Sequence, residues 1–167
     1  MKKVLFVRHA KSDFGNDQLT DHDRPLNKSG IKDAEIMGGE LKYNKIFPET
    51  FITSSANRAY TTCQIFKDKL KSRDKTIIES KIYNNGKKGV LDSIHSIDDK
   101  IKFIALFGHN PTMHEIANYI SENPIYEFKT CSMILTSSSI SKWIEYDFFN
   151  SKLLMYEYPR RTGSYID

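Results

Sequence analysis

Two histidines and two arginines stand where a folded chain could bring them together. Arg8 and His9 end the apolar run KVLFV, and His109 follows the apolar run KFIALF and one glycine. Arg58 comes shortly after Ser54, in the segment SSANRA. A guanidinium binds phosphate oxygens in pairs and stays charged at any working pH, and an activated imidazole can act as a nucleophile. These residue types therefore predict phosphoryl transfer through a histidine nucleophile.

The elements that would carry these residues alternate between strand and helix. Strands are expected at residues 3–7, 51–52, 76–79 and 102–107. Helices are expected at residues 28–43, capped by Asn27, from Ser54 or Ser55 to 70, at 86–97, and from Pro111 to 120. This alternation predicts an α/β fold with a mainly parallel central sheet. The apolar runs 130–138, 141–148 and 151–158 predict further strands that make the sheet mixed at its C-terminal edge.

One edge of this sheet would collect the polar residues that follow its strands. Ligands of open α/β sheets bind beyond the carboxyl ends of the strands. Arg8-His9, Ser54-Ser55 and His109-Asn110 each follow a predicted strand. Helix N-termini close to the second and third of these segments would add backbone N–H donors. We therefore expect one anion-binding site built by three segments.

Composition limits the classes of protein that fit this chain. A length of 167 residues with 39% apolar residues predicts a single domain over residues 1–167. A net charge of +4, with no recognised motif or long basic stripe, argues against a nucleic-acid partner. The N-terminal apolar run is too short for a signal peptide, and no run is long enough to span a membrane. We expect a cytoplasmic protein, without a membrane partner, that works as a monomer.

Four motifs in register resemble those of the histidine phosphatase superfamily, which also contains the cofactor-dependent phosphoglycerate mutases. They are VRHA at 7–10, DRPLNKSG at 23–30, SSANRA at 54–59 and GHNP at 108–111. The second is similar to the SixA-type phosphohistidine phosphatases, and KTCSMIL, Trp143 and the tail YPRR fit that branch. The resemblance implies a phosphoglycerate mutase-like fold, a three-layer α/β/α sandwich, and a reaction that needs no metal and no cofactor.

The resemblance also implies a role for individual residues. His9 is the nucleophile that takes the phosphoryl group, and Arg8 and Arg58 bind its oxygens. His109 is the second histidine of the pocket, which donates to the phosphoryl group and stabilises charge in the transition state. Arg24, on the polar loop 11–25, points at the phosphate.

Two of the expected binding residues have alternatives. Arg24 either binds phosphate or pins its loop to a carboxylate such as Asp23. Ser55 either binds the substrate or only caps a helix. Asn110, within GHNP, is a further substrate-binding residue.

The general acid of the related mutases has no clear counterpart here. The region after the third strand reads SKIYNNGKK, with Tyr83, Asn84 and Asn85 at the expected position. Other carboxylates could serve instead, namely Asp13, Asp17, Asp21 and Glu79. An alkoxide must be protonated to leave, whereas an imidazole is a less basic leaving group. The missing acid therefore favours a phosphorus–nitrogen bond in the substrate.

The leading hypothesis is a phosphohydrolase that works through a phosphohistidine intermediate on His9 and acts on phosphohistidine in a protein, such as a histidine-phosphotransfer protein. A phosphomonoesterase for small phosphorylated metabolites is the enzyme alternative. A phosphate-binding module without catalysis is the non-enzyme alternative, although phosphate binding alone needs only the arginines.

Overall fold

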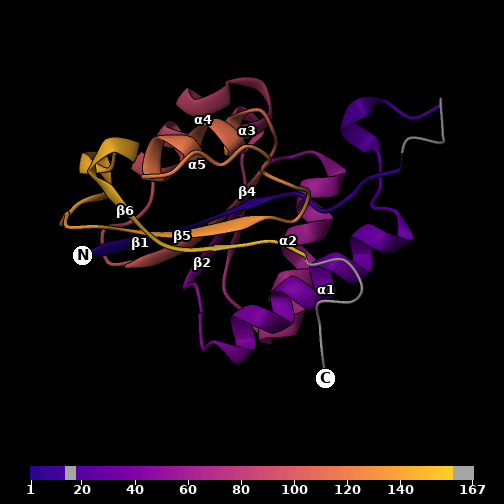
Figure 1. Cartoon of the computed structure of the whole chain (residues 1–167), viewed down its shortest axis with the longest axis horizontal. Helices are drawn as coiled ribbons and strands as arrows, with labels where there is room; N and C mark the ends of the chain where they lie inside the picture. Colours follow the sequence, from indigo (N-terminus) through magenta and orange to yellow (C-terminus); the bar gives the residue numbers. More distant parts are fainter. Residues whose placement is uncertain (14–17, 160–167) are drawn as a thin grey trace.

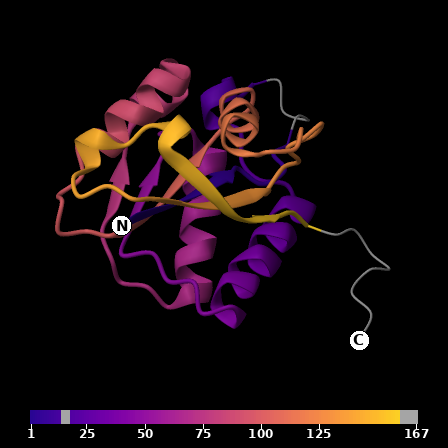
Figure 2. The same ribbon diagram turned by 60° about the vertical axis from the view of Figure 1, so that its left-hand side comes forward.

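The computed structural model describes residues 1–13 and 18–159, which form one six-stranded sheet with helices on both faces (Figures 1 and 2). The strands are β1 (Lys2–Arg8), β2 (Thr50–Thr53), β3 (Thr76–Ile78), β4 (Phe103–Gly108), β5 (Met133–Ser138) and β6 (Ser151–Glu157). The helices are α1 (Lys28–Tyr43), α2 (Asn57–Leu70), α3 (Ser80–Asn84), α4 (Gly86–His95) and α5 (Thr112–Ile120). Three 3₁₀ turns are η1 (Asp21–Asp23), η2 (Trp143–Glu145) and η3 (Phe148–Asn150).

The strand order is β3-β2-β4-β1-β5-β6. The first four strands in this order are parallel to one another, whereas β5 is antiparallel to both β1 and β6. The predicted mainly parallel sheet with a mixed C-terminal edge is thus confirmed. No helix in the part of the chain that the structure describes is long and apolar enough to cross a membrane.

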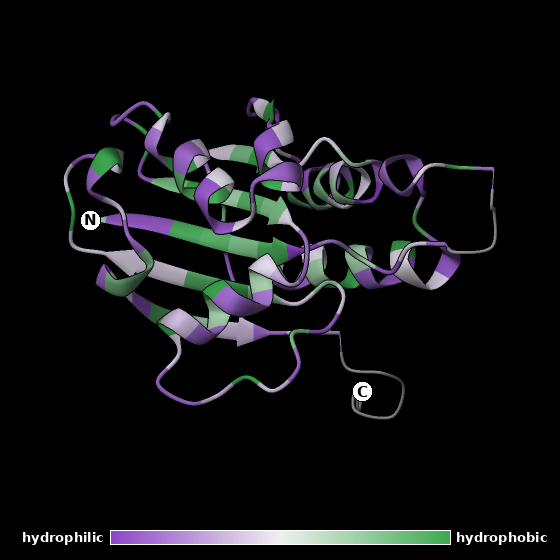
Figure 3. Cartoon of the chain, turned by 90° about the horizontal axis from the view of Figure 1, so that it is seen from above, coloured by the Kyte–Doolittle hydropathy of each residue, from purple (hydrophilic) through white to green (hydrophobic). Residues whose placement is uncertain are grey.

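Alternate residues of the central strands feed two separate cores, which makes the fold a three-layer sandwich as expected. Val4 and Phe6 of β1 belong to a core under α3, α4 and α5, and Leu5 and Val7 belong to a core over α1 and α2. The two helix layers lie above and below the sheet in Figure 1, and long stretches of the central strands carry the hydrophobic colour in Figure 3. A strand covered on both faces needs such a continuous apolar run.

Some expected elements are wrong in detail. The run 141–148 is not a strand but contains the turn η2 and the first residue of η3, and its apolar side chains Trp143, Tyr146 and Phe148 fill the core beneath α4 and α5. The expected helix 86–97 ends at His95, and the short α3 before it was not predicted. Neither serine caps α2, because its cap position is held by Ala56.

The helix α1 begins as the sequence predicts. The Asn27 side chain accepts a hydrogen bond from the Gly30 amide at 2.8 Å, and the Asn27 amide donates to the Lys11 carbonyl at 3.0 Å. These bonds tie the start of α1 to the chain just beyond His9. A Cβ atom placed on Gly30 would lie 2.1 Å from the Lys11 carbonyl oxygen, so only glycine fits this close approach.

We expect Gly30→Ala to destabilise the protein by about 1–3 kcal/mol, because the methyl group forces the Lys11 backbone away. Gly39→Ala is the matched control on the same helix, where an added Cβ meets nothing within 4 Å. The control should keep or raise the stability by up to about 1 kcal/mol. Urea unfolding of both variants measures the difference, and equal midpoints would contradict the proposed close contact.

Candidate active site

The strand register brings the predicted histidines together. Arg8 of β1 is the parallel partner of Gly108 of β4, so His9 and His109 follow their strands side by side. Their ring centroids are 5.0 Å apart, with an interplanar angle of 53°. On the other side of β4, Thr53 is paired with Phe107, which places Ser54 beside the same strand end.

His9 is buried, with 8% of its surface exposed, and its ring is held in one orientation. Its Nδ1 lies 2.7 Å from the Ala10 carbonyl oxygen, which can only accept, so Nδ1 carries the proton. Its Nε2 accepts a hydrogen bond from Nε of Arg58 at 3.2 Å. The lone pair of Nε2 therefore faces the arginine that is expected to hold a phosphoryl group, as a nucleophile must.

The surroundings keep His9 neutral. Burial, and after it the positive charges of Arg58, Arg8 and Arg24, lower its pKa to about 4, against the opposing effect of its bond to Ala10. At neutral pH the imidazole is consequently unprotonated at Nε2 in almost every molecule.

His109 is also held neutral at neutral pH. Its Nε2 and the Ser54 hydroxyl are hydrogen-bonded at 2.7 Å, and its Nδ1 is buried without a hydrogen-bond partner among the described residues. Burial and then the neighbouring His9 and Arg58 lower its pKa to about 3. A phosphoryl group between the two rings would add negative charge, which favours protonation of His109 when substrate binds.

Arg8 and Asn110 are fixed by one backbone carbonyl. Nη1 of Arg8 donates to the Phe128 oxygen at 2.7 Å, and Nδ2 of Asn110 donates to the same oxygen at 3.0 Å. The Nε of Arg8 is buried and has no partner among the described residues. This guanidinium edge is therefore the one that remains for an anion.

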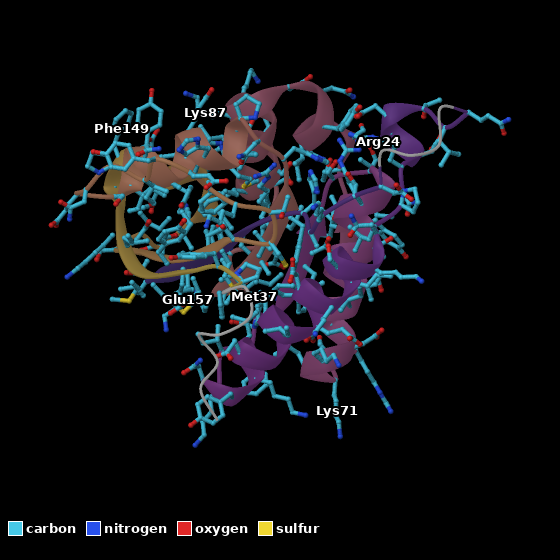
Figure 4. The ribbon with its side chains drawn as sticks, turned by 45° about the vertical axis from the view of Figure 1, so that its right-hand side comes forward. Arg24, Met37, Lys71, Lys87, Phe149 and Glu157 are labelled. Carbon is cyan, nitrogen blue, oxygen red and sulfur yellow. The ribbon has the colours of Figure 1, made fainter. Side chains whose placement is uncertain are left out.

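Arg58 lies between His9 and the turn η1. Its Nη2 donates to Oδ2 of Asp21 at 3.0 Å, and its Nη1 donates to the Asp21 carbonyl oxygen. Asp21 also pairs with Arg24 through Oδ1 and accepts from the Tyr83 hydroxyl at 2.6 Å. The bond from Tyr83, followed by those from Arg58 and Arg24, holds the pKa of Asp21 well below its usual range. Figure 4 shows Arg24 at this end of the molecule, away from Phe149.

Two of the expected binding residues make other contacts here. Arg24 pairs with a carboxylate, as its alternative predicts, but the carboxylate is that of Asp21 rather than Asp23. The Ser55 hydroxyl is hydrogen-bonded to Nε2 of His22 at 2.9 Å, and it does not cap α2. It thus supports the turn η1, whereas Ser54, whose hydroxyl bonds His109, was not singled out from the pair.

The carboxylates expected as possible general acids differ in where they lie and what they contact. Asp21 enters the site, but as an ionised carboxylate. Glu79 pairs with Lys81 at 3.4 Å, and Asp13 is exposed. Asp17 lies outside the described residues, as do Arg160 and Arg161 of the tail YPRR.

At the position expected for the acid, only Tyr83 faces the site. Its ring meets that of His109 edge-on at 5.4 Å, whereas Asn84 and Asn85 are exposed. Its hydroxyl donates to Asp21, and this bond raises its pKa. A phenol whose proton is held in this way is a weak general acid.

A metal ion would need a set of side chains that could bind it within the described residues, 1–13 and 18–159. Within these ranges, no group of three or more His, Cys, Asp or Glu side chains is placed to hold a metal ion. The structure does bring together a neutral buried histidine, a second histidine and two arginines, which is the arrangement expected of a phosphatase with a histidine nucleophile.

Comparison with known proteins agrees with this class. Residues 4–82 match the histidine phosphatase superfamily (branch 1). The uncharacterized protein Rv1276c of Mycobacterium tuberculosis is 31% identical over 111 residues, which cover 66% of this chain and 67% of that protein. The chain therefore belongs to the histidine phosphatase superfamily, and it is a histidine phosphatase.

Solved structures share the fold over nearly the whole chain. The SixA protein of Agrobacterium tumefaciens matches with a TM-score of 0.79 at 21% identity, covering 95% of this chain and 99% of that one. A protein histidine phosphatase SixA in complex with tungstate matches with a TM-score of 0.77 at 16% identity, covering 93% and 96%. The phosphoglycerate mutase-like fold expected from the sequence is thus confirmed.

The depressed pKa of His9 predicts how stability depends on pH. The unfolded chain takes up a proton on this histidine near pH 6.5, whereas the folded chain does so only near pH 4. The contribution is therefore complete above pH 6.5 and is lost as the pH falls toward 4. Between pH 7 and 5 the free energy of unfolding should fall by about 2 kcal/mol more in the wild type than in His9→Gln. Denaturant titrations at both pH values measure this difference, and parallel pH dependences would refute it.

Proposed function

We propose that this phosphatase removes the phosphoryl group from phosphohistidine on a protein, through a phosphohistidine intermediate on His9. The observation that supports this most is the state of the acidic groups. The site presents a neutral nucleophile, but the carboxylate beside it, Asp21, is held ionised by three donors. Such a site can attack phosphorus, yet it has no protonated carboxyl to give to an alkoxide.

The first step transfers the phosphoryl group between two imidazoles. Nε2 of His9 attacks phosphorus while the bond from phosphorus to the substrate nitrogen breaks, and the electron pair stays on that nitrogen. When the other ring nitrogen of the substrate carries a proton, the leaving group is neutral imidazole and no proton has to move. Arg8 and Arg58 bind the phosphoryl oxygens, and the Nδ1 proton of His9, held by Ala10, balances the charge on the phosphorylated ring.

The second step is hydrolysis of the intermediate. Water attacks the phosphorus, the bond to Nε2 of His9 breaks, and dihydrogen phosphate leaves with both protons of the water. His9 regains its lone pair and keeps its Nδ1 proton. We assign to His109 the role of a donor to the phosphoryl oxygens, which its ring centroid distance of 5.0 Å from His9 supports.

The phosphomonoesterase alternative depends on Tyr83. Its hydroxyl lies at the site, so it is the group that would have to protonate an alkoxide leaving group. The bond to Asp21 raises its pKa and opposes this role. We therefore rank a phosphotransfer protein above small phosphorylated metabolites as the substrate. We also propose that the enzyme is cytoplasmic and monomeric.

A substrate panel tests the proposed specificity. We expect kcat/KM to be highest for a phosphohistidine peptide, lower for p-nitrophenyl phosphate and lowest for sugar phosphates and phosphoglycerates. Without a general acid, rates on phosphate esters should depend steeply on the pKa of the leaving group, because the developing charge is not neutralised. Efficient hydrolysis of alkyl phosphates with a shallow dependence would favour the phosphomonoesterase alternative.

Substitution of the two histidines tests the intermediate. His9→Ala should abolish turnover of every substrate in the panel, because the lone pair that attacks phosphorus is gone. His109→Ala should retain weak activity and let the phosphoenzyme accumulate. Labelling with a ³²P substrate and quenching in base should reveal base-stable, acid-labile label in the wild type and none in His9→Ala. Substantial activity of a folded His9→Ala protein would mean that the nucleophile is another residue.

A further inference from the structure

Asp21 occupies a position that a phosphoryl group would need. The Nε–H and one Nη2–H of a guanidinium point the same way and form the edge that binds two oxygens of a phosphoryl group. In Arg58 this edge faces Nε2 of His9 at 3.2 Å and Oδ2 of Asp21 at 3.0 Å. The nucleophile and the carboxylate therefore lie side by side along the edge that the substrate must use.

The carboxylate also lies on the open side of the site. Asp21 has 54% of its side chain exposed, whereas His9 and Arg58 are buried. The nucleophile and the leaving group stand roughly in line across the phosphorus, so the leaving group departs on the side away from His9. A bound phosphoryl group has to displace the carboxylate from Arg58 toward that open side.

Two side chains keep the carboxylate near the pocket after such a displacement. Arg24 pairs with Oδ1 of Asp21, and the Tyr83 hydroxyl donates to Oδ2 at 2.6 Å. The backbone of Asp21 is held as well, because its carbonyl oxygen accepts from Nη1 of Arg58. The negative charge thus remains at the entrance, beside the leaving group.

This charge affects different substrates in opposite ways. It repels a phosphate dianion and the developing negative charge of an alkoxide or phenoxide leaving group. It attracts a protonated phosphohistidine ring, whose second nitrogen offers an N–H donor. On the basis of the proposed function, we infer that Asp21 is a specificity-determining residue, which selects phosphohistidine over phosphate esters and free phosphate by competing for Arg58 and accepting the ring N–H.

The test compares Asp21→Asn with Asp23→Asn, a matched change in the same turn. The Asp23 carboxylate accepts from Thr20 at 2.7 Å and contacts His22, outside the edge of Arg58. Removal of the charge in Asp21→Asn should lower the inhibition constant of inorganic phosphate and raise kcat/KM for p-nitrophenyl phosphate relative to a phosphohistidine peptide, each by about tenfold. Asp23→Asn should leave both quantities within about twofold of the wild type.

Other results would overturn either this inference or the proposed function. A parallel loss of activity on both substrates, with no tighter binding of phosphate, would show that Asp21 only supports Arg58 and would overturn the inference. If Asp21→Asn does not fold, Tyr83→Phe serves, since loss of one donor should ease displacement of the carboxylate and lower the phosphate inhibition constant. An unchanged constant in folded Tyr83→Phe would then overturn it. If the wild type does not prefer phosphohistidine over phosphate esters, the proposed function itself is refuted. If the wild type does prefer phosphohistidine and Asp21→Asn prefers it equally, only this inference is refuted.

Discussion

The parallel register of β1 with β4 is the constraint on which the site depends. Because Arg8 is paired with Gly108, the next residue on each strand is a histidine, and the two rings meet. A shift of one residue would turn the apolar side chains of β1 to the opposite faces and separate the histidines. The two cores on either side of the sheet therefore fix the position of His9 as much as its own hydrogen bonds do.

Burial gives this site its chemistry and also creates an electrostatic problem. Removal from water keeps both histidines neutral, which a nucleophile requires, but it also gathers three arginines around one small volume. Hydrogen bonds to backbone oxygens, from Arg8 to Phe128 and from Arg58 to Asp21, disperse part of this charge. The Asp21 carboxylate neutralises more of it through its ion pairs with Arg58 and Arg24.

The sequence predicts what depends on neighbours along the chain and misses what depends on distant contacts. Apolar runs identify β1 and β4, and a polar residue after each identifies His9 and His109. Ser54 bonds His109 whereas Ser55 bonds His22, and residue type does not reveal which of these adjacent serines faces the site. The run 141–148 is apolar because it closes a core, and the pattern alone does not distinguish such turns from a strand.

The same limit explains why the sequence does not distinguish Asp21 from the other carboxylates that could be a general acid. Nothing near it in the sequence shows that Arg58 and Tyr83, 37 and 62 residues further on, both bind it. These contacts change the chemical role expected of Asp21. A carboxylate considered as a source of protons is instead an ionised acceptor, held so by Tyr83, Arg58 and Arg24. On the proposed role of Asp21, such a phosphatase would bind phosphate less tightly, release its product more readily and disfavour substrates that bring only negative charge.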